Sequence, residues 1–349
     1  MHRSILYLFT LAIGLVIALG TSTSALADDF YKGKVIRFVV GYTPGGGYDT
    51  YTRAVVRHIG KYIPGNPIPI VQNRSGAGSL IAANYTYNRA KPDGLTVGVW
   101  NSAIVLKQAL GDRAVKLKAE RMGWIGAPVK GFPACAIMGF TGLKTFKDIR
   151  NSSQRIKLGS TTPGGTTYDL PVILNKTLGT NFDVITGYRG TSTIRIAMQK
   201  QEVDGACWGW ESMSVTAKAM LDATGDKRLI PFLIHGTVDD PQVKDLPQVI
   251  QAIKGKDNLA TFNSWVRQYE FQRPLSFPPG TPKDRLEILR KAYGAVMSDP
   301  KFLAEAKKSK LIINYVSGEE IEKFVAEILA IPASAKENLS FLVRKSKKK

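Results

Sequence analysis

The chain has 349 residues, of which 44% are hydrophobic and 22% are charged, and its formal net charge at pH 7 is +20. Its glycines and prolines form no periodic or low-complexity run, which excludes collagen-like and largely disordered proteins. Because a single hydrophobic core rarely serves more than about 250–300 residues, this length predicts two domains.

The N-terminus has the pattern of a secretory signal peptide. His2 and Arg3 precede an uncharged apolar run from Ile5 to Gly20, and the small-residue motif Ala25-Leu26-Ala27 follows it. A basic start, a short apolar run and an A-x-A site are typical of a cleaved leader. The sequence therefore predicts a signal peptide over residues 1–27, cleavage after Ala27, and a mature protein in the periplasm.

Strands and helices alternate in the first part of the mature chain. Val35–Val40 is a predicted strand, Gly41–Gly47 a loop and Tyr48–Tyr62 a helix. The next unit repeats this order, with predicted strands at Ile68–Gln72 and Leu95–Trp100 and a helix at 79–90 between them. Strands that alternate with helices predict a mostly parallel sheet covered by helices.

A second set of such units begins near Gly131. Its predicted strands are Cys135–Met138, Ile156–Gly159, Phe182–Gly187, Val203–Cys207 and Leu229–Ile234, and its predicted helices are Thr167–Leu178 and Thr191–Gln201. We expect the proline-rich segment Val238–Pro247 to carry the chain back to the first lobe. This assigns residues 28–130 and 236–349 to lobe 1 and residues 131–235 to lobe 2.

Three helices are predicted near the C-terminus, and we expect them to pack on the first lobe. They are Pro282–Met297, Pro300–Lys308 and Gly318–Ile331. Thr281 and Asp299 each precede a proline, which predicts a capping residue followed by proline at the first helical position. The basic tail Arg344–Lys349 is predicted to be a solvated chain end.

Cys135 and Cys207 are the only cysteines. An exported chain could join them in one disulfide, but both lie in apolar strand-like runs that suit two buried thiols equally well. The sequence leaves these alternatives open. The histidines, His2, His58 and His235, give no metal-ligand spacing with a cysteine, so no metal site is predicted.

The most informative feature is a loop that occurs twice. Thr43-Pro44-Gly45-Gly46 recurs as Thr162-Pro163-Gly164-Gly165, each after a predicted strand and before a predicted helix, and Tyr48-Asp49 and Tyr168-Asp169 follow. Glycine lets a backbone approach a ligand closely, and the first N–H groups of a helix carry partial positive charge. Two such helix starts that face each other across a cleft would hold a carboxylate.

Each part of this pattern also has a purely structural explanation. A single Thr-Pro-Gly-Gly turn is common between a strand and a helix, and Asp49 and Asp169 would equally serve as helix N-caps. Trp100 and Tyr188 at strand ends would line the cleft or pack inside a lobe. The second copy of the turn is what favours a binding site.

At these residues the chain resembles the substrate-binding proteins of tripartite tricarboxylate transporters, the Bug-type periplasmic binding proteins. The matching stretches run in family order over nearly the whole mature chain: Val39–Asp49, Asn73–Ser79, Asn84–Tyr87, Pro92–Gly94, Gly187–Gly190, Glu202–Gly205 and Pro278–Pro282. The departure is Thr162–Tyr168, where many relatives have a Gly/Ser-rich loop followed by a histidine.

The resemblance implies a type II periplasmic-binding-protein fold, a hinged Venus-flytrap of class α/β. It further implies a ligand carboxylate held, partly through water, by backbone groups of the first-lobe loop and of its second-lobe counterpart. Family ligands include tricarboxylates, dicarboxylates, aromatic acids and amino acids. The predicted ligand-binding residues are Tyr42, Thr43, Pro44, Gly45, Gly46, Gly47, Tyr48, Asp49, Asn73, Trp100, Thr161, Thr162, Gly164, Gly165, Thr166, Thr167, Tyr188 and Asp204.

The predicted function is therefore that of a monomeric, exported solute-binding protein without a cofactor. It would capture a small carboxylate between two lobes and deliver it to the permease subunits of a tripartite tricarboxylate-type transporter, with no role for nucleic acid. An exported enzyme acting on a carboxylate is the first alternative, but the chain has no GxxxxGK[ST], GxSxG or HExxH motif. A ligand-loaded sensor for a membrane receptor is the second.

Overall fold

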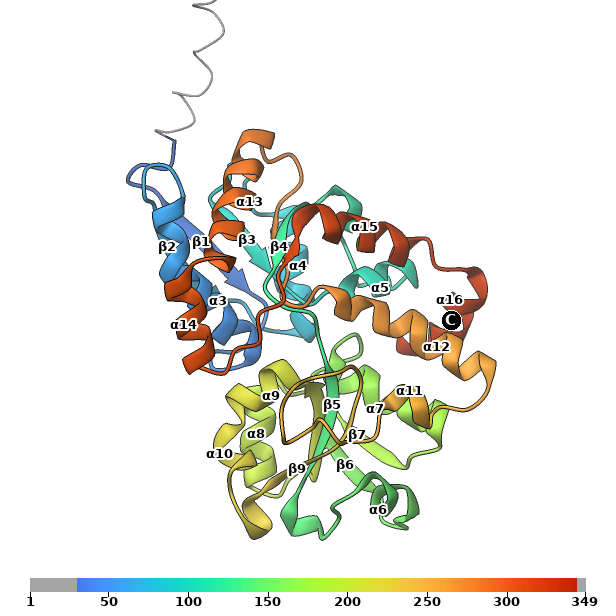
Figure 1. The fold of residues 1–349 in the computed structure, drawn as a ribbon. Coiled ribbons are helices and arrows are strands. Elements are labelled where there is room, and N and C mark those ends of the chain that lie inside the picture. The colour runs from blue at the N-terminus through green and yellow to red at the C-terminus, as the bar shows by residue number, and fades with distance from the viewer. Residues whose placement is uncertain (1–29, 344–349) are drawn as a thin grey trace, which may run out of the picture.

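The computed structural model describes residues 30–343, which form two lobes joined by two crossing segments (Figure 1). The predicted signal peptide and the basic tail lie outside these described residues. Among the described helices, none has both the length and the apolar character needed to cross a membrane.

The first lobe is built on a six-stranded sheet with the strand order β11-β4-β10-β3-β1-β2. Its strands are β1 (Val35–Val40), β2 (Ile68–Asn73), β3 (Thr96–Val99), β4 (Gly123–Ala127), β10 (Leu275–Phe277) and β11 (Val316–Ser317). Strand β1 pairs parallel with β2 and β3, whereas β10 runs antiparallel to β3 and β4, and β11 runs antiparallel to β4. This sheet is therefore mixed.

The second lobe has a five-stranded sheet with the order β7-β6-β8-β5-β9. Its strands are β5 (Pro133–Met138), β6 (Ile156–Gly159), β7 (Phe182–Ile185), β8 (Gly205–Gly209) and β9 (Leu229–Ile234). Strand β6 is parallel to β7 and β8, and β5 is antiparallel to β8 and β9. In both sheets the strand that comes from a crossing segment, β10 or β5, runs against its neighbours. The predicted two-lobed α/β fold is confirmed. The prediction of mostly parallel sheets is wrong, because β10 and β5 enter their sheets antiparallel and make both sheets mixed.

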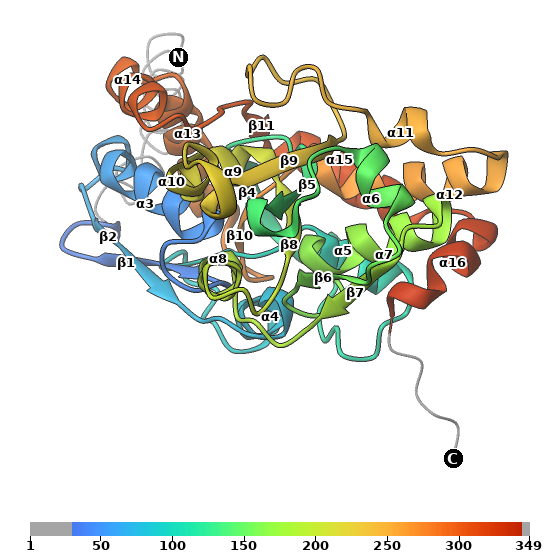
Figure 2. The same cartoon turned by 90° about the horizontal axis from the view of Figure 1, so that it is seen from below.

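Helices cover both sheets. The described helices are α3 (Gly47–Ile59), α4 (Leu80–Asn88), α5 (Ala103–Ala109), α6 (Phe146–Asn151), α7 (Thr166–Leu178), α8 (Thr191–Gln199), α9 (Trp210–Thr216), α10 (Lys218–Leu221), α11 (Val249–Ala252), α12 (Lys256–Val266), α13 (Lys283–Met297), α14 (Pro300–Lys308), α15 (Gly318–Leu329) and α16 (Ala333–Leu339). Helices α8, α9 and α10 lie on one side of the second sheet, and α6 and α7 lie on the other (Figures 1 and 2).

Strand β5 shows why both faces of the second sheet are covered. Successive side chains of a strand point to opposite faces. Ala134 and Ala136 belong to the core cluster that includes residues of α8 to α10, whereas Cys135 and Ile137 belong to the cluster that includes residues of α6 and α7. An uninterrupted apolar run of this kind is typical of a strand buried on both faces.

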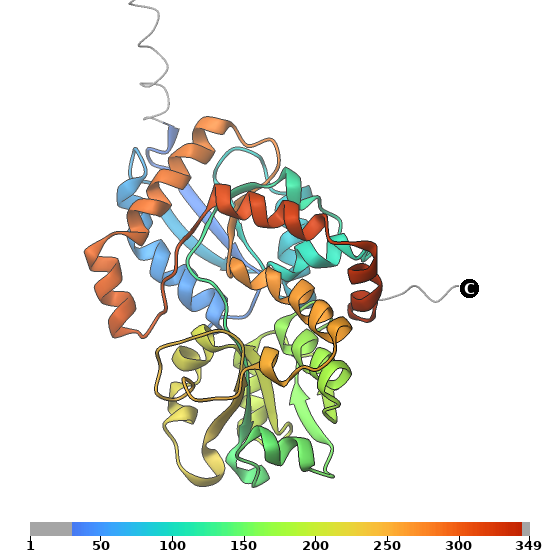
Figure 3. The ribbon, with the colours of Figure 1, turned by 45° about the vertical axis from the view of Figure 1, so that its right-hand side comes forward.

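The predicted crossing at Val238–Pro247 is wrong. This segment stays on the second lobe, where Ile234 N donates to Pro247 O at 3.1 Å and Val243 is buried in the core cluster of α8 to α10. Its prolines mark a loop that folds back along β9, and Gln248 still bridges to Ile234. The chain returns to the first lobe later, through α12 and on to β10 (Figure 3).

The three predicted C-terminal helices pack on the first lobe, as expected. Helix α13 contacts α3 and β4, and α15 contacts α5 and β4. The predicted cap at Asp299 is confirmed, because its Oδ1 accepts a hydrogen bond from Lys301 N at 2.9 Å. The predicted cap at Thr281 is wrong. Its hydroxyl donates to Pro278 O at 2.9 Å, and Pro282 is the N-cap of a helix that begins at Lys283.

Cys135 and Cys207 form a disulfide. They are direct neighbours on β5 and β8, where the antiparallel register pairs one with the other. The structure thus decides between the two alternatives that the sequence left open, in favour of the bridge.

We expect replacement of both Cys135 and Cys207 by alanine to lower the free energy of unfolding by about 2–4 kcal/mol, because the bridge restricts the unfolded chain. Urea unfolding of the double variant, with the wild type as reference, measures the loss. A midpoint equal to that of the oxidised wild type would contradict this expectation.

Candidate functional site

The two Thr-Pro-Gly-Gly loops have the same conformation. In Thr43–Gly46 and Thr162–Gly165, the last N–H donates to the first carbonyl, at 3.4 Å and 3.1 Å. The third residue of each is a glycine with positive φ, 73° in the first loop and 87° in the second. Proline in the second position and a glycine of positive φ in the third are the features of a type II turn.

An aspartate holds each turn from the helix that follows. Asp49 accepts from Gly45 N at 2.9 Å, and Asp169 accepts from Gly164 N at 2.9 Å. Helices α3 and α7 both have a glycine as N-cap, so neither aspartate is an N-cap. Their carboxylates reach back from the first turn of the helix and fix the loop in front of it.

A cavity of about 50 Å³ lies between the lobes where these helices begin. It is lined by Tyr42, Gly46, Gly47, Tyr48, Asn101, Gln272 and Arg273 from the first lobe and its crossing segment, and by Thr161, Thr166, Thr167, Thr191, Trp208, Gly209, Glu211 and Ser212 from the second. Helices α3, α7, α8 and α9 all have first-turn residues in this lining or next to it. The positive ends of helix dipoles favour an anion.

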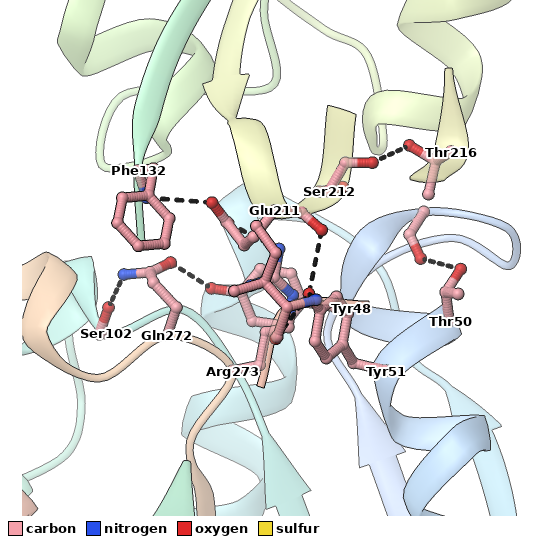
Figure 4. Close-up of polar contacts among 12 residues, drawn as sticks. Tyr48, Thr50, Tyr51, Ser102, Phe132, Glu211, Ser212, Thr216, Gln272 and Arg273 are labelled. Atoms are coloured by element: carbon pink, nitrogen blue, oxygen red, sulfur yellow. Dashed lines mark hydrogen bonds and ion pairs between the residues drawn. The ribbon is translucent and has the colours of Figure 1, made fainter. Parts of the chain in front are cut away.

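A buried ion pair forms one wall of the cavity (Figure 4). Arg273 Nη2 lies 2.8 Å from Glu211 Oε1, and the two side chains are 3% and 2% exposed. Glu211 Oε2 also accepts from Phe132 N at 3.0 Å. The guanidinium lies over the rings of Tyr48 and Tyr51, 5.4 Å and 4.4 Å from their centroids. Burial alone would lower the pKa of Arg273, but the Glu211 carboxylate helps to raise it above its usual value, so the arginine stays charged.

The backbone around Arg273 is constrained. Arg273 has φ of 60°, a left-handed conformation that costs a residue with a side chain about 1–2 kcal/mol. The preceding residue, Gln272, donates from its Nε2 to Ser102 Oγ at 2.7 Å and to Gln268 O at 2.9 Å. Its backbone N–H also donates to Val129 O at 2.8 Å. These contacts hold the strained residue in the wall of the cavity.

Two tyrosines contribute neutral hydroxyl groups. Tyr42 and Tyr48 have ring centroids 4.6 Å apart. The Tyr42 hydroxyl accepts from Asn101 Nδ2 at 2.9 Å, and burial raises the pKa of Tyr42 to about 12. Burial likewise raises the pKa of Tyr48 well above its usual value. Both groups therefore remain protonated at neutral pH.

The lobes also touch directly beside the cavity. Thr43 Oγ1 lies 2.7 Å from Ser192 Oγ, and Arg195 Nη2 donates to Gly45 O at 3.1 Å. The approach is also close at Gly47, where a Cβ atom would lie 2.2 Å from Ser212 Oγ. Glycine at this position is therefore required by the fit of the lobes in this closed arrangement.

Known proteins share this architecture to different extents. No family model matches the chain. Protein BugT of Bordetella pertussis is 33% identical over 98 residues, which are 28% of this chain and only 29% of that protein. A UPF0065 protein of the same organism is 21% identical over 320 residues, which are 90% of this chain and 92% of that protein. The chain is related to the Bug-type proteins. The resemblance predicted from its motifs is confirmed.

Solved structures show that this chain has the fold of periplasmic binding proteins. The structure of BugD has a TM-score of 0.69 at 19% identity, over 86% of this chain and 95% of that one. MatC (Rpa3494) from Rhodopseudomonas palustris with bound malate has a TM-score of 0.66 at 18% identity, over 88% of this chain and 99% of that one. The shared feature is the two-lobed fold.

The structure brings together part of the predicted ligand site. The predicted residues that line the cavity are Tyr42, Gly46, Gly47, Tyr48, Thr161, Thr166 and Thr167. The predicted residues Thr43, Pro44, Gly45, Asp49, Thr162, Gly164 and Gly165 lie in the same turns or hold them but do not line the cavity. The two predicted loops therefore do meet at one cavity.

Two predicted residues of the first lobe do not reach the cavity. Trp100 Nε1 donates to Ser276 Oγ at 3.0 Å, and its ring lies 5.1 Å from that of Trp124 in the lobe core. Asn73 Nδ2 donates to Tyr42 O at 2.9 Å, so this side chain supports the loop from behind. Trp100 therefore packs inside the lobe and does not line the cleft, which decides between the two alternatives that the sequence left open.

Two predicted residues of the second lobe also lie elsewhere. Tyr188 packs against the core cluster of α8 to α10, with a ring atom 3.6 Å from where a Cβ of Gly159 would lie. Asp204 accepts from Lys157 N at 2.7 Å and immediately precedes β8. Ligands of such sheets bind at the carboxyl ends of the strands, and Asp204 is at the amino end.

The sequence did not predict Glu211 and Arg273 as site residues, although each carries a signal. Glu211 lies just beyond the carboxyl end of β8, where binding residues are expected. Arg273 is a charge inside the apolar, proline-rich run Phe271–Pro279. The other lining residues that were not predicted are Asn101, Thr191, Trp208, Gly209, Ser212 and Gln272. Among residues 30–343, no group of three or more His, Cys, Asp or Glu side chains could hold a metal ion.

Asp169 is a buried carboxyl group behind the second turn. Burial raises the pKa of Asp169 from 3.8 to about 7, against the opposing hydrogen bond from Gly164 N and the charge of Lys107. The folded protein therefore holds a proton on Asp169 at pH values where the unfolded chain does not. The contribution of Asp169 to the free energy of unfolding therefore falls as pH rises from about 4 to about 7.

We expect Asp169→Asn to remove this pH dependence, because the amide oxygen keeps the acceptor for Gly164 N but does not titrate. The melting temperature of the variant, relative to the wild type, should increase as pH rises through the interval and be highest above pH 7. Thermal melts of both proteins across this range test the expectation. Two curves that run parallel would contradict it.

Proposed function

We propose that the protein is an extracytoplasmic solute-binding protein that captures a small carboxylate between its lobes and delivers it to the membrane subunits of a tripartite tricarboxylate-type transporter. The observation that carries the proposal is the pair of matched turns, Thr43–Gly46 and Thr162–Gly165, which begin α3 and α7 at one cavity. Bound malate in MatC supports the ligand class. The predicted signal peptide supports a periplasmic location.

The polarity of the cavity supports an anionic ligand. Backbone N–H groups in the first turn of a helix lack a partner within the helix, and the helix dipole adds partial positive charge. Here α3 and α7 bring such ends from opposite lobes, and α8 adds a third through Thr191. A carboxylate can therefore be bound by backbone groups from both lobes at once.

The proposed mechanism is hinge closure around the ligand. A cavity of about 50 Å³ has room for only a few water molecules, at about 10–15 Å³ each. A larger acid therefore requires the lobes to separate and then to close around it. Contacts such as Thr43 to Ser192 join the lobes in this closed form, so the ligand must add its own interactions with both lobes to favour closure.

The chemistry of the cavity favours binding over catalysis. Glu211 is the carboxylate that lines the cavity. Both oxygens of Glu211 already have partners, Phe132 N and Arg273. Such a group is a poor general base. Tyr42 and Tyr48 remain protonated because burial raises the pKa of each. These groups suit hydrogen bonding to a ligand that leaves unchanged.

A thermal-shift screen of the mature protein identifies the ligand, and Gly47→Ala tests where it binds. The screen compares mono-, di- and tricarboxylates, aromatic acids and amino acids, and calorimetry gives the affinity of each hit.

A Cβ at Gly47 would lie 2.2 Å from Ser212 Oγ. We expect affinity to fall roughly 10- to 100-fold, because overpacking costs about 1–3 kcal/mol. The melting temperature of the ligand-free variant should change little, since the open form relieves the overlap.

Gly294→Ala is the matched control. It lies in α13, and its nearest contact to an added Cβ would be the Tyr315 hydroxyl at 3.7 Å, an ordinary packing distance. We expect unchanged affinity in this variant. Wild-type affinity in Gly47→Ala, or no carboxylate among the hits of the screen, would refute the proposed function.

A further inference from the structure

We propose that Arg273 binds the carboxylate of the ligand directly and that Glu211 is the positioning residue that holds the guanidinium in the cavity wall. This inference rests on the proposed function and adds to it a contact that the glycine turns do not supply. The turns offer partial charges of backbone groups. Arg273 offers a full positive charge, so the site should select an ionised carboxylate over a neutral group of the same shape.

The argument begins with the hydrogen-bonding donors of Arg273. Its side chain is 3% exposed and lines the cavity. Nη2 donates to Glu211 Oε1 at 2.8 Å. Within the described part of the chain, Nε and Nη1 are buried and have no hydrogen-bond partner. Buried donors are almost always paired, and guanidinium donors are well suited to a carboxylate.

The surroundings fix the guanidinium in place. Glu211 is itself held by Phe132 N at 3.0 Å, and its carbonyl accepts from the Tyr51 hydroxyl at 3.0 Å. The rings of Tyr48 and Tyr51 cover the guanidinium. A purely structural ion pair would be expected to use its donors within the protein. This one engages Nη2 and leaves Nε and Nη1 of the same group without a partner in the described part of the chain, in a residue that lines the cavity.

Other basic residues near the turns have different surroundings. Lys107 Nζ lies 2.6 Å from Asp112 Oδ2 and donates to Pro163 O at 3.2 Å. Arg195 donates to Gly45 O at 3.1 Å. Neither lines the cavity, and among the described lining residues Arg273 is the one with a positive side chain. We therefore assign the recognition of full negative charge to Arg273.

Glu211 and Arg273 should have opposite effects on binding. Glu211 places a negative charge beside the site and engages one donor of the arginine. Its replacement by Gln leaves the positive charge of Arg273 with less compensation, which favours an incoming anion. Replacement of Arg273 by Gln removes the attraction altogether. If both residues had only a structural role, both replacements would weaken binding, because the closed form would be lost.

Small probes allow a test that does not depend on the natural ligand. Formate and acetate are carboxylates small enough for a cavity of about 50 Å³, and formamide and acetamide are their neutral counterparts. The shift in melting temperature is measured against probe concentration, with sodium chloride at equal concentration as the ionic reference. The proteins are the wild type, Arg273→Gln, Glu211→Gln and the double variant Arg273→Gln/Glu211→Gln.

The double variant guards against misfolding, because removal of one partner alone leaves a buried charge without compensation. Arg290→Gln is the matched control. Arg290 is 12% exposed, pairs with Glu319 at 2.9 Å and donates to Trp124 O at 2.9 Å, away from the cavity. Near-UV circular dichroism establishes that each variant is folded before binding is compared.

We expect formate or acetate, and neither amide, to stabilise the wild type and Arg290→Gln beyond the effect of chloride. Binding should weaken about 10- to 100-fold in Arg273→Gln and in the double variant, as expected for loss of hydrogen bonds from a charged group. Glu211→Gln should bind with unchanged or severalfold higher affinity. The same variants are then compared by calorimetry with each acid found in the screen.

Three results would overturn the inference. One is a wild type that responds to neither formate nor acetate, and another is a folded Arg273→Gln that keeps the response. The third is a loss in Glu211→Gln as large as that in Arg273→Gln. If Arg273→Gln binds a screened acid as tightly as the wild type does, this inference fails while the proposed function stands. If the wild type binds no carboxylate, both fail.

Discussion

The buried contact between Glu211 and Arg273 links the parts of the molecule on which the site depends. Arg273 lies on the segment that returns to the first lobe, and Phe132, which donates its N–H to Glu211, lies on the segment that leaves it. Glu211 itself belongs to the first turn of α9 in the second lobe, and Tyr51 reaches its carbonyl from α3 of the first. Breaking one partner of a buried pair leaves a charge without compensation, which is strongly unfavourable. The two crossing segments and the wall of the cavity therefore depend on the same ion pair, Glu211 with Arg273.

The symmetry of the two lobes explains why helix ends gather at this place. Strands β2-β1-β3-β10-β4 of the first sheet correspond in order to β7-β6-β8-β5-β9 of the second. In each lobe the loop after the second strand of this series, β1 or β6, is a type II turn that begins a helix. Because the carboxyl ends of the parallel strands face the gap between the lobes, both helices direct their positive ends there.

Much of this arrangement could be predicted from the sequence, because local patterns specify strands, turns and helix starts. Thr43–Gly46 and Thr162–Gly165 were recognisable as a pair, since both the turn residues and their place between strand and helix repeat. Contacts between distant residues could not be predicted in this way. Glu211 and Arg273 are 62 residues apart, and no local pattern states that they meet. Trp100 follows a strand like a site residue, but only the packing of Trp124 shows that its ring turns inward.

The disulfide has a mechanical consequence for the cavity. Cys135 follows Phe132 by three positions and Cys207 precedes Glu211 by four, on strands whose register continues to Pro133 opposite Gly209. The disulfide therefore links β5, which follows the first crossing segment, to β8, which ends at the cavity wall. Within the second lobe, β5 and β8 cannot slide past each other. The end of the first crossing segment at Phe132 and the cavity wall at Glu211 should therefore move together when the lobes separate.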